Sequence, residues 1–391
     1  MKRFRSILFW CHLSIGAVAG LVVLLMSVTG VLLAYQKQVT AWADLRGLDG
    51  SPPAASSARL PLDRLVAAAA AGERGPATSI LLRNDAAAPL QVSFGRDRLT
   101  FVNVYTGEVL GHGSAGTRRF FRVVTDWHRW LGMADAGRDT GRMITGAANL
   151  GFLFLVLSGM YLWWPRNVTR RVLRGILWFR GGLSGKARDF NWHNVIGIWS
   201  AVPLSIVVAS GVVISYRWAG DLVYRAAGEA PPSAQRRPEA GEPKGTDLAG
   251  LDPVVAAAGS HLRGWRMLTL QPPAPGVDTV RLTLDAGTGG QPQHRAQLAL
   301  SRTDGRVLKW EPFSAGSPGR RARSILRFAH TGEVWGIAGQ TLAGLVSFGA
   351  AFLVWTGLSL ALRRLRSAGS RPPRGGVAQR SSREEVAAPV N

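Results

Sequence analysis

The chain has 391 residues, a formal net charge of +23 and a single cysteine. One cysteine excludes an internal disulfide and a cysteine-based metal site. The basic residues gather beside long apolar stretches, an arrangement that topology in a membrane explains and nucleic-acid binding does not. We therefore expect a lipid bilayer, and no nucleic acid, as a partner.

Four apolar stretches are long enough to cross a bilayer, which requires about 20 apolar residues in a helix. They lie at about 7–35, 143–164, 194–217 and 337–362. The first stretch is too long for a cleaved signal peptide, so we expect it to remain as an anchor. The sequence predicts a membrane protein with four transmembrane α-helices.

The charge distribution predicts the orientation of these helices. Residues 165–190 carry seven Arg or Lys against Asp189, and the tail after residue 362 carries seven Arg. The long segments 36–140 and 218–330 are nearly balanced, with 13 basic to 10 acidic and 15 basic to 10 acidic residues. The positive-inside rule then places both termini and the basic loop in the cytoplasm, and the two long segments outside.

The first and third helices are copies of one another. "HLSIGAVAGLVVLLMSVTGVLLAY" at 12–35 aligns without a gap with "HNVIGIWSAVPLSIVVASGVVISY" at 193–216. The aligned identities include His12 with His193, Gly16 with Gly197, Gly30 with Gly211 and Tyr35 with Tyr216. The chain is therefore expected to contain two tandem helix–module–helix repeats.

Each of the four helices also carries a Ser/Thr-Gly pair near one end. The pairs are Thr29-Gly30, Ser158-Gly159, Ser210-Gly211 and Thr356-Gly357. Small residues allow membrane helices to approach closely, so we interpret these pairs as packing positions.

The two outer segments repeat as well. "LDRLVAAAA" (62–70) parallels "LDPVVAAAG" (251–259), and runs of alternating polarity with Thr-Gly or Asp-Gly turns follow each. Such runs predict antiparallel hairpins, so each segment is expected to be a small α+β module.

The predicted divisions are transmembrane helix 1 at 1–36, the first module with the segment before helix 2 at 37–140, helix 2 at 141–165, a cytoplasmic basic loop at 166–192, helix 3 at 193–217, the second module with the segment before helix 4 at 218–335, helix 4 at 336–362 and a disordered tail at 363–391.

Four of the seven histidines lie at related places in the two repeats. His12 and His193 lie near the cytoplasmic ends of helices one and three, and His128 and His330 precede helices two and four. The repeat predicts that they form two facing pairs. A lone histidine in a membrane helix usually bonds a backbone carbonyl or a hydroxyl, but a buried ionisable group is also a functional hypothesis. Two imidazoles are too few for a zinc site and suit the axial positions of a haem iron.

Glycines near these histidines favour a flat cofactor. Gly16 and Gly197 follow His12 and His193 by four residues and so share their helix faces. Gly132 stands at the same offset from His128, whereas the residue four after His330 is Val334.

Aromatic and basic residues beside the outer histidines are candidates for the surroundings of a haem or a substrate. Trp127 and Trp130 are expected either to form part of an interfacial aromatic belt or to wall a ligand. The arginines are expected either to pair with haem propionates or to lie solvated at the headgroup level; they are Arg129, Arg323 and Arg327.

The helix pattern H-x-x-x-G…[ST]-G, the segments "HRWLG" and "HTGEVWG" and the ending "YTGEVLG" resemble the PepSY-associated transmembrane family, the iron-regulated membrane proteins. The resemblance covers about residues 7–365 and is strongest to the FoxB-type ferric-siderophore reductases of the bacterial inner membrane. It implies periplasmic PepSY-like modules and two b-type haems with bis-histidine ligation. It assigns one haem to His12 and His193 and the other to His128 and His330.

The resemblance also implies an activity, ferric-siderophore reduction. Electrons from a cytoplasmic-side donor, a quinol or a flavoprotein, would cross the membrane and reduce a periplasmic ferric siderophore held between the two modules, releasing Fe(II). Two alternatives remain open. One is a siderophore permease or binding protein without redox chemistry, and the other is a haem-free regulatory membrane protein.

Overall fold

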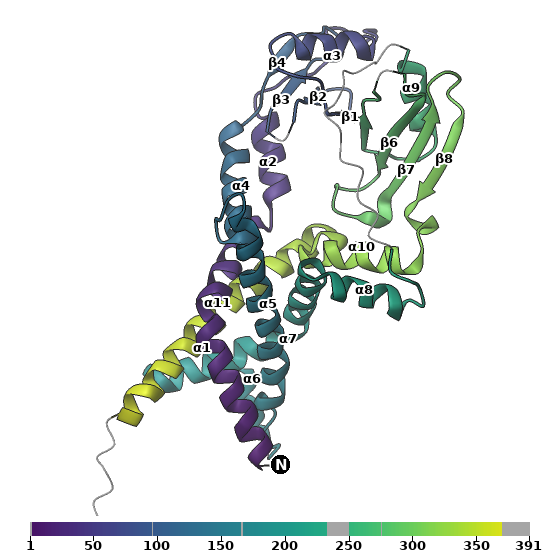
Figure 1. Cartoon of the computed structure of the whole chain (residues 1–391). Helices are drawn as coiled ribbons and strands as arrows, with labels where there is room; N and C mark the ends of the chain where they lie inside the picture. Colours follow the sequence, from purple (N-terminus) through teal and green to yellow (C-terminus); the bar gives the residue numbers. More distant parts are fainter. Residues whose placement is uncertain (1, 96, 166, 233–249, 275, 370–391) are drawn as a thin grey trace, which may run out of the picture.

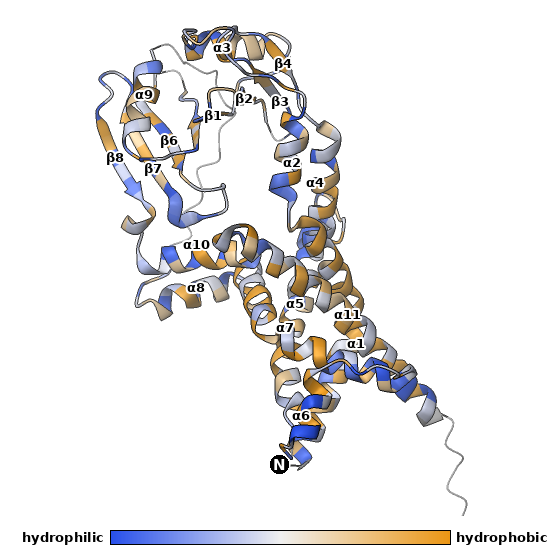
Figure 2. Cartoon of the chain, turned by 180° about the vertical axis from the view of Figure 1, so that it is seen from behind, coloured by the Kyte–Doolittle hydropathy of each residue, from blue (hydrophilic) through white to orange (hydrophobic). Residues whose placement is uncertain are grey.

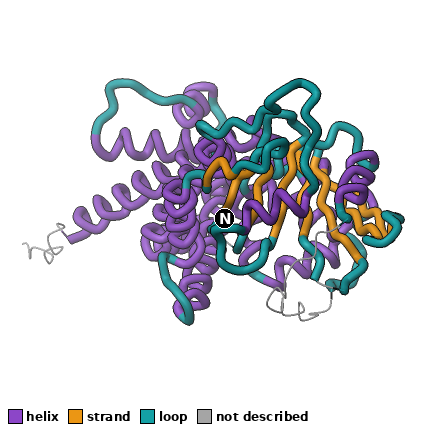
Figure 3. The backbone as a smooth tube through the Cα atoms, turned by 90° about the horizontal axis from the view of Figure 1, so that it is seen from above, coloured by secondary structure: helices purple, strands orange, loops and turns teal. Residues whose placement is uncertain are grey.

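The computed structural model describes residues 2–95, 97–165, 167–232, 250–274 and 276–369. A bundle of long helices forms one end of the molecule, and an antiparallel sheet lies beyond the other end of the bundle (Figure 1). Seen from above, the strands lie to one side of the bundle (Figure 3). We call the end of the bundle near the sheet the sheet end, and the opposite end the basic end.

Four helices of the described chain are long and apolar enough to span a membrane, which confirms the prediction of four transmembrane helices. Apolar residues predominate along them, and polar residues gather at the basic end (Figure 2). They are α1 (Lys2–Leu33), α5 (Gly137–Trp163), α7 (Gly185–Ser215) and α11 (Gly336–Gly369).

Two helix boundaries differ from the prediction. Helix α7 begins at Gly185, inside the predicted basic loop, and that loop also contains helix α6 (Arg170–Leu177). Helix α11 continues to Gly369, so residues 363–369 of the predicted disordered tail are helical. Residues 370–391 lie outside the described part of the chain, as do residues 233–249. Both helices extend past their apolar windows because Arg and Lys are good helix formers outside the bilayer.

The four long helices form a ring. Helix α1 packs against α5 and α11, and α7 packs against the same two helices. Helices α1 and α7, which are the two copies of one repeat element, therefore lie diagonally opposite each other. This arrangement directs equivalent residues of α1 and α7 toward a shared interior.

Short helices connect the bundle to the sheet. In the first repeat they are α2 (Gln36–Leu45), α3 (Leu62–Ala70) and α4 (Ala115–Trp130); in the second they are α8 (Arg217–Ala226), α9 (Asp252–Ser260) and α10 (Pro318–His330). Helices α2 and α4 stand upright between the bundle and the sheet, whereas α8 and α10 extend sideways from the upper end of the bundle, below the strands of the second repeat (Figure 1). The two repeats therefore share a fold plan but reach the sheet in different ways.

The strands of both repeats join in one eight-stranded antiparallel sheet with the order β4-β3-β2-β1-β5-β6-β7-β8. The first repeat contributes β1 (Ser79–Arg83), β2 (Leu90–Ser93), β3 (Leu99–Val102) and β4 (Val109–Gly111), and the second contributes β5 (Met267–Gln271), β6 (Thr279–Asp285), β7 (Arg295–Ser301) and β8 (Val307–Pro312).

Strands β1 and β5 form the seam between the repeats. Ile80 lies opposite Leu270 and Leu82 opposite Leu268, and a single apolar core continues across this seam from both modules. Each module was predicted from its own alternating pattern. The structure adds that the two modules are joined by main-chain pairing into one sheet.

The sheet is also fastened to the bundle beside His330. The ammonium of Lys37 lies 2.6 Å from the Glu333 carboxylate and donates a hydrogen bond to the carbonyl of Gly289, in the β6–β7 connection. From the same connection, the amide of Gln293 donates to the carbonyl of Val334. These contacts hold the turn that follows His330.

The seam predicts a stability difference between two leucines. Leu268 is fully buried in β5, so Leu268→Ala is expected to destabilise the sheet by about 2–5 kcal/mol through lost burial and a residual cavity. Leu308→Ala is the matched control, because Leu308 is 43% exposed on the edge strand β8 and its loss is expected to cost less than about 0.5 kcal/mol. Urea titration of the detergent-solubilised chain with pulse proteolysis measures both. Equal midpoints for the two variants would contradict the seam as a core element.

Candidate functional site

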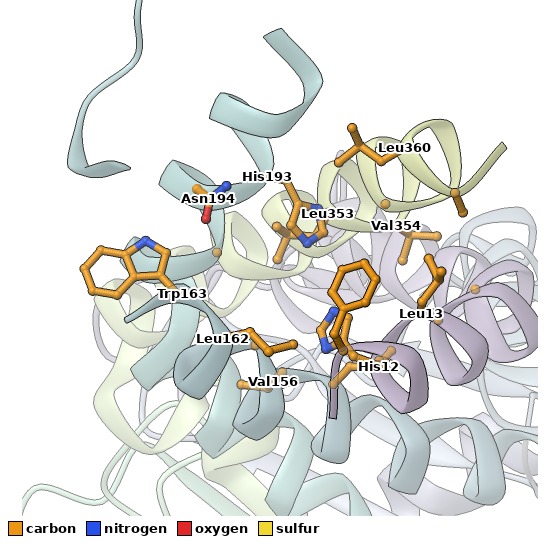
Figure 4. A pocket seen from close by; sticks show the side chains of 18 of the residues that line it. His12, Leu13, Val156, Leu162, Trp163, His193, Asn194, Leu353, Val354 and Leu360 are labelled. Carbon is orange, nitrogen blue, oxygen red and sulfur yellow. The ribbon is translucent and has the colours of Figure 1, made fainter. Parts of the chain in front are cut away.

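His12 and His193 lie in the bundle toward its basic end. They come from the diagonally opposed helices α1 and α7 and line one cavity of about 710 Å³. Figure 4 shows both imidazoles pointing into this cavity, among apolar side chains such as Leu353 and Val156. The volume is typical of a cofactor site. We call these two residues the inner pair.

Each imidazole of the inner pair bonds a hydroxyl of a neighbouring helix. His12 Nδ1 lies 2.9 Å from Ser158 Oγ in α5, and His193 Nδ1 lies 2.9 Å from Thr356 Oγ1 in α11. Both partners belong to the Ser/Thr-Gly pairs of the sequence. The predicted pairing of His12 with His193 is thus accompanied by two contacts that were not predicted.

His128 and His330 form the outer pair at the sheet end. His128 comes from α4 and His330 is the last residue of α10, and their ring centroids are 6.4 Å apart with the rings tilted by 56°. His128 Nδ1 lies 2.9 Å from Thr29 Oγ1 in α1. His330 Nδ1 lies 2.8 Å from the carbonyl of Val207 and 3.5 Å from Ser210 Oγ, both in α7.

The hydrogen bonds assign the same tautomer to all four histidines. Each hydroxyl donates its own proton to a carbonyl of the preceding turn: Thr29 to Leu25, Ser158 to Leu155, Ser210 to Ile206 and Thr356 to Phe352. The hydroxyl oxygen is then an acceptor, and the Val207 carbonyl has no proton to give. Nδ1 therefore carries the proton and donates it, which leaves Nε2 with a free lone pair.

The glycine of each Ser/Thr-Gly pair makes room for an imidazole. A Cβ atom added to Gly30, Gly159, Gly211 or Gly357 would lie 3.2–3.6 Å from Cε1 of the histidine that the adjacent hydroxyl bonds. The contact is closest at Gly211, where the added Cβ would also lie 2.9 Å from Asn149 Nδ2. These glycines let the histidines lie against a neighbouring helix, a role more specific than the close helix packing that the sequence predicts.

The glycines expected beside the histidines divide into two groups. Gly16 and Gly197 line the inner cavity, and a Cβ added at either position would meet only the tip of a leucine. Because glycine has no side chain, the cavity is wider at these two positions. Gly132 is different. Helix α4 ends at Trp130, and Gly132 lies beyond it with φ of +72° in the turn that closes the helix. The expectation that it shares a helix face with His128 is wrong, because the four-residue offset applies only inside a helix.

Burial sets the protonation of the outer pair. It lowers the pKa of His128 to about 4, with a further contribution from the neighbouring His330. Burial also lowers the pKa of His330, and the charge of Arg327 acts in the same direction. Both imidazoles are therefore neutral at pH 7, in agreement with the assigned tautomer.

The aromatic and basic residues predicted near the outer pair lie around it on the surface. Trp127 covers the Gly132 turn, and Trp130 is stacked between the guanidiniums of Arg129 and Arg138 at 4.6 and 4.8 Å. Partial burial, and then the like charges of Arg327 and Arg142, lower the pKa of Arg129. Arg323 lies against Gly220 of α8, away from this cluster, so the structure groups two of the three predicted arginines.

Several polar residues of the inner cavity were not predicted. Arg5, Lys186 and Arg364 line it, and so does Trp163, whose Nε1 is buried with no hydrogen-bond partner among the described residues. In the sequence these residues stand beside the basic ends of the apolar stretches. The positive-inside rule already accounts for basic residues there, so their position did not point to a cavity. The cavity is thus apolar with hydrogen-bond donors and cations at the basic end.

The hydroxyl contacts lead to a prediction for histidine chemistry. Thr356→Val removes the acceptor for His193 without changing the side-chain shape, so His193 is expected to populate both tautomers. The ¹⁵N spectrum of the histidine-labelled full chain measures this. Ser205→Ala is the control, since the Ser205 hydroxyl bonds the Ala201 carbonyl of its own helix. A His193 signal that stays with the Nδ1–H tautomer in Thr356→Val would show that the hydroxyl does not select it.

Comparison with known proteins gives one family. No curated protein matches the chain. A family model described as the PepSY-associated TM region matches residues 9–364. That match includes all of α5 and α7, most of α1 and α11, the whole sheet and both histidine pairs. The chain therefore belongs to the PepSY-associated transmembrane family.

Proposed function

We propose that the protein is a di-haem oxidoreductase of the inner membrane that reduces a periplasmic ferric siderophore with electrons from the cytoplasmic side. The observation that carries this proposal is the shared state of the four histidines. Each donates Nδ1–H to a neighbouring helix and keeps Nε2 free, and they occur as two facing pairs. A second partner that fixes the tautomer of a histidine is the usual accompaniment of metal ligation.

The inner cavity fits a haem by its shape and its donors. His12 and His193 enter it from opposite helices, Gly16 and Gly197 widen it, and its walls are otherwise mainly apolar. At the basic end, Arg5, Lys186, Arg364 and the unpartnered Trp163 Nε1 would meet the carboxylates of the macrocycle. A charge-assisted hydrogen bond of this kind is stronger than one between neutral groups.

The outer pair fits by its separation. A histidine nitrogen lies about 2 Å from a metal that it ligates, so imidazoles on opposite sides of one ion have ring centres roughly 6 Å apart. The centroids of His128 and His330 are 6.4 Å apart. Arg129 and Arg327 lie at the rim of this pair, where they would neutralise carboxylates.

The two pairs lie near opposite faces of the bilayer. His12 and Thr29, the partner of His128, are about 25 Å apart along α1 at about 1.5 Å per residue. A haem held by either histidine pair would supply one-electron transfer. Each electron reduces one Fe(III) of the chelate to Fe(II), and the donor, a quinol or a flavoprotein, is oxidised by the same number of electrons. Fe(II) then leaves a chelator whose hard oxygen ligands prefer Fe(III).

The packing of the bundle disfavours the permease alternative. A transport path requires polar groups that face a passage at mid-depth. Asn149 donates to the carbonyl of Val208, and Gln340 is 2% exposed and donates to the carbonyl of Ala34. Both amides are therefore used in helix contacts. Between the two histidine pairs the bundle is filled by an apolar cluster that includes Leu204 and Val346.

Haem content tests the proposal directly. The purified protein is expected to hold two b-type haems by pyridine haemochrome, and His12→Ala and His128→Ala are each expected to retain one. The haem that remains serves as the folding control in each variant. His261→Ala, at the end of helix α9, is the matched control and is expected to retain both. Reduced wild-type protein is then expected to be reoxidised by a ferric siderophore. A colourless protein after haem-replete expression would overturn the proposal.

Filling the inner cavity provides a test that leaves the ligands in place. Gly16→Phe directs a large side chain into the cavity, so the inner haem is expected to be lost while the outer haem remains. Gly72→Phe is the control, because nothing lies within 4 Å of a Cβ at Gly72. Absorption spectra of the reduced proteins measure this, and two haems in Gly16→Phe would contradict the assigned cavity.

A further inference from the structure

A second cavity, of about 270 Å³, lies between helix α10 and strands β6–β8. Phe328 and Ser324 line it from α10, and Thr283 and Gln297 line it from the sheet. Since residues two apart in a helix point about 200° from each other, Phe328 and His330 lie on opposite faces of α10. Helix α10 is therefore a single wall between this cavity and the outer histidine pair, and it lies between the bundle and the strands in Figure 1.

The lining of this cavity carries an excess of positive charge. Its charged members are Arg295, Arg320 and Arg321 against the carboxylate of Glu311. Glu311 pairs with Arg320 at 3.4 Å, and Arg295 pairs with Asp285 at 2.6 Å. Arg321 has no ion pair with a described acidic residue. The half-buried guanidinium of Arg321 therefore lines the cavity without a counter-charge.

Further cations surround the ring of Phe328. Lys37, Arg295 and Arg327 lie 5.4, 5.3 and 5.7 Å from its centroid. Lys37 is paired with Glu333, so the uncompensated charge beside the ring is that of Arg327. Arg321 and Arg327 thus place positive charge at both ends of the cavity wall that α10 provides.

We infer that this cavity binds carboxylate groups of an anionic ferric chelate, which places the substrate of the proposed reductase beside the second repeat. A guanidinium presents a planar fork of donors that matches a carboxylate, and Ser324, Thr283 and Gln297 supply further hydrogen bonds. The volume lies at the small end of ligand sites and suits a ligand of about citrate size or one carboxylate arm of a larger chelate. The inference rests on the proposed function for its substrate, but binding itself needs no electron transfer.

Equilibrium binding of ferric citrate to the oxidised, detergent-solubilised full chain tests the inference. Arg321→Gln is expected to weaken binding about tenfold or more, the effect of losing one charged hydrogen-bonded pair. Arg321→Lys is expected to recover part of the affinity. Arg306→Gln is the matched control, because Arg306 follows the β7–β8 turn at the end of the hairpin remote from the cavity.

Three outcomes would overturn the inference: equal affinity in wild type and Arg321→Gln, equal affinity for an uncharged ferric trihydroxamate, or displacement by inorganic phosphate at equal concentration, which would indicate a general anion site. His128→Ala separates the inference from the proposed function. It is expected to bind ferric citrate as wild type does, since His128 lies outside the cavity. Wild-type protein that holds no haem but binds ferric citrate in an Arg321-dependent way would reject the reductase and keep the site.

Discussion

A hydrogen bond from imidazole Nδ1 to the next helix is the interaction on which the rest of the bundle depends. A neutral histidine in an apolar bundle has one donor and one acceptor to satisfy. Here a hydroxyl or carbonyl takes the donor in all four cases. The acceptor, Nε2, is left to face the interior, which is the state that a metal ligand requires. The same bonds join α1 to α5 and α7 to α11, so they hold the helices and prepare the histidines together.

The ring arrangement of the helices makes two sites from one duplicated element, each with one histidine from each repeat. Within each repeat, the first helix offers a histidine to the second helix, and the segment before the second helix offers a histidine back to the first. Because α1 and α7 are diagonal, the inner histidines of the two repeats meet across the interior. The repeats differ above the bundle. Helix α4 stands upright and α10 lies flat (Figure 1), and a charged cavity lies beside α10 in the second repeat.

Much of this architecture follows from local patterns in the sequence. Apolar length predicts the four spans, alternation predicts strands in both modules, and the gapless repeat predicts that His12 and His193 are equivalent. The seam was not predictable in the same way, because alternation identifies a strand but not the edge to which it pairs. The hydroxyl partners were visible as Ser/Thr-Gly pairs but were interpreted as packing. Their contact with a histidine depends on the rotation of two helices about their axes. The prediction that Gly132 shares a helix face with His128 was wrong because helix α4 ends at Trp130, before Gly132.

The β1–β5 seam has a consequence for how the chain is made. Strand β1 is synthesised long before β5, yet its hydrogen-bonding edge is completed only by β5. Until β5 is made, an edge strand with Ile80 and Leu82 is open to any other extended segment, the situation in which sheets associate wrongly. The membrane helices α5 and α7 lie between β1 and β5 in the chain. The edge of β1 is therefore paired late, after a long stretch of chain has been made. A mutation that slows insertion of α7 would therefore damage the sheet without changing a residue in it.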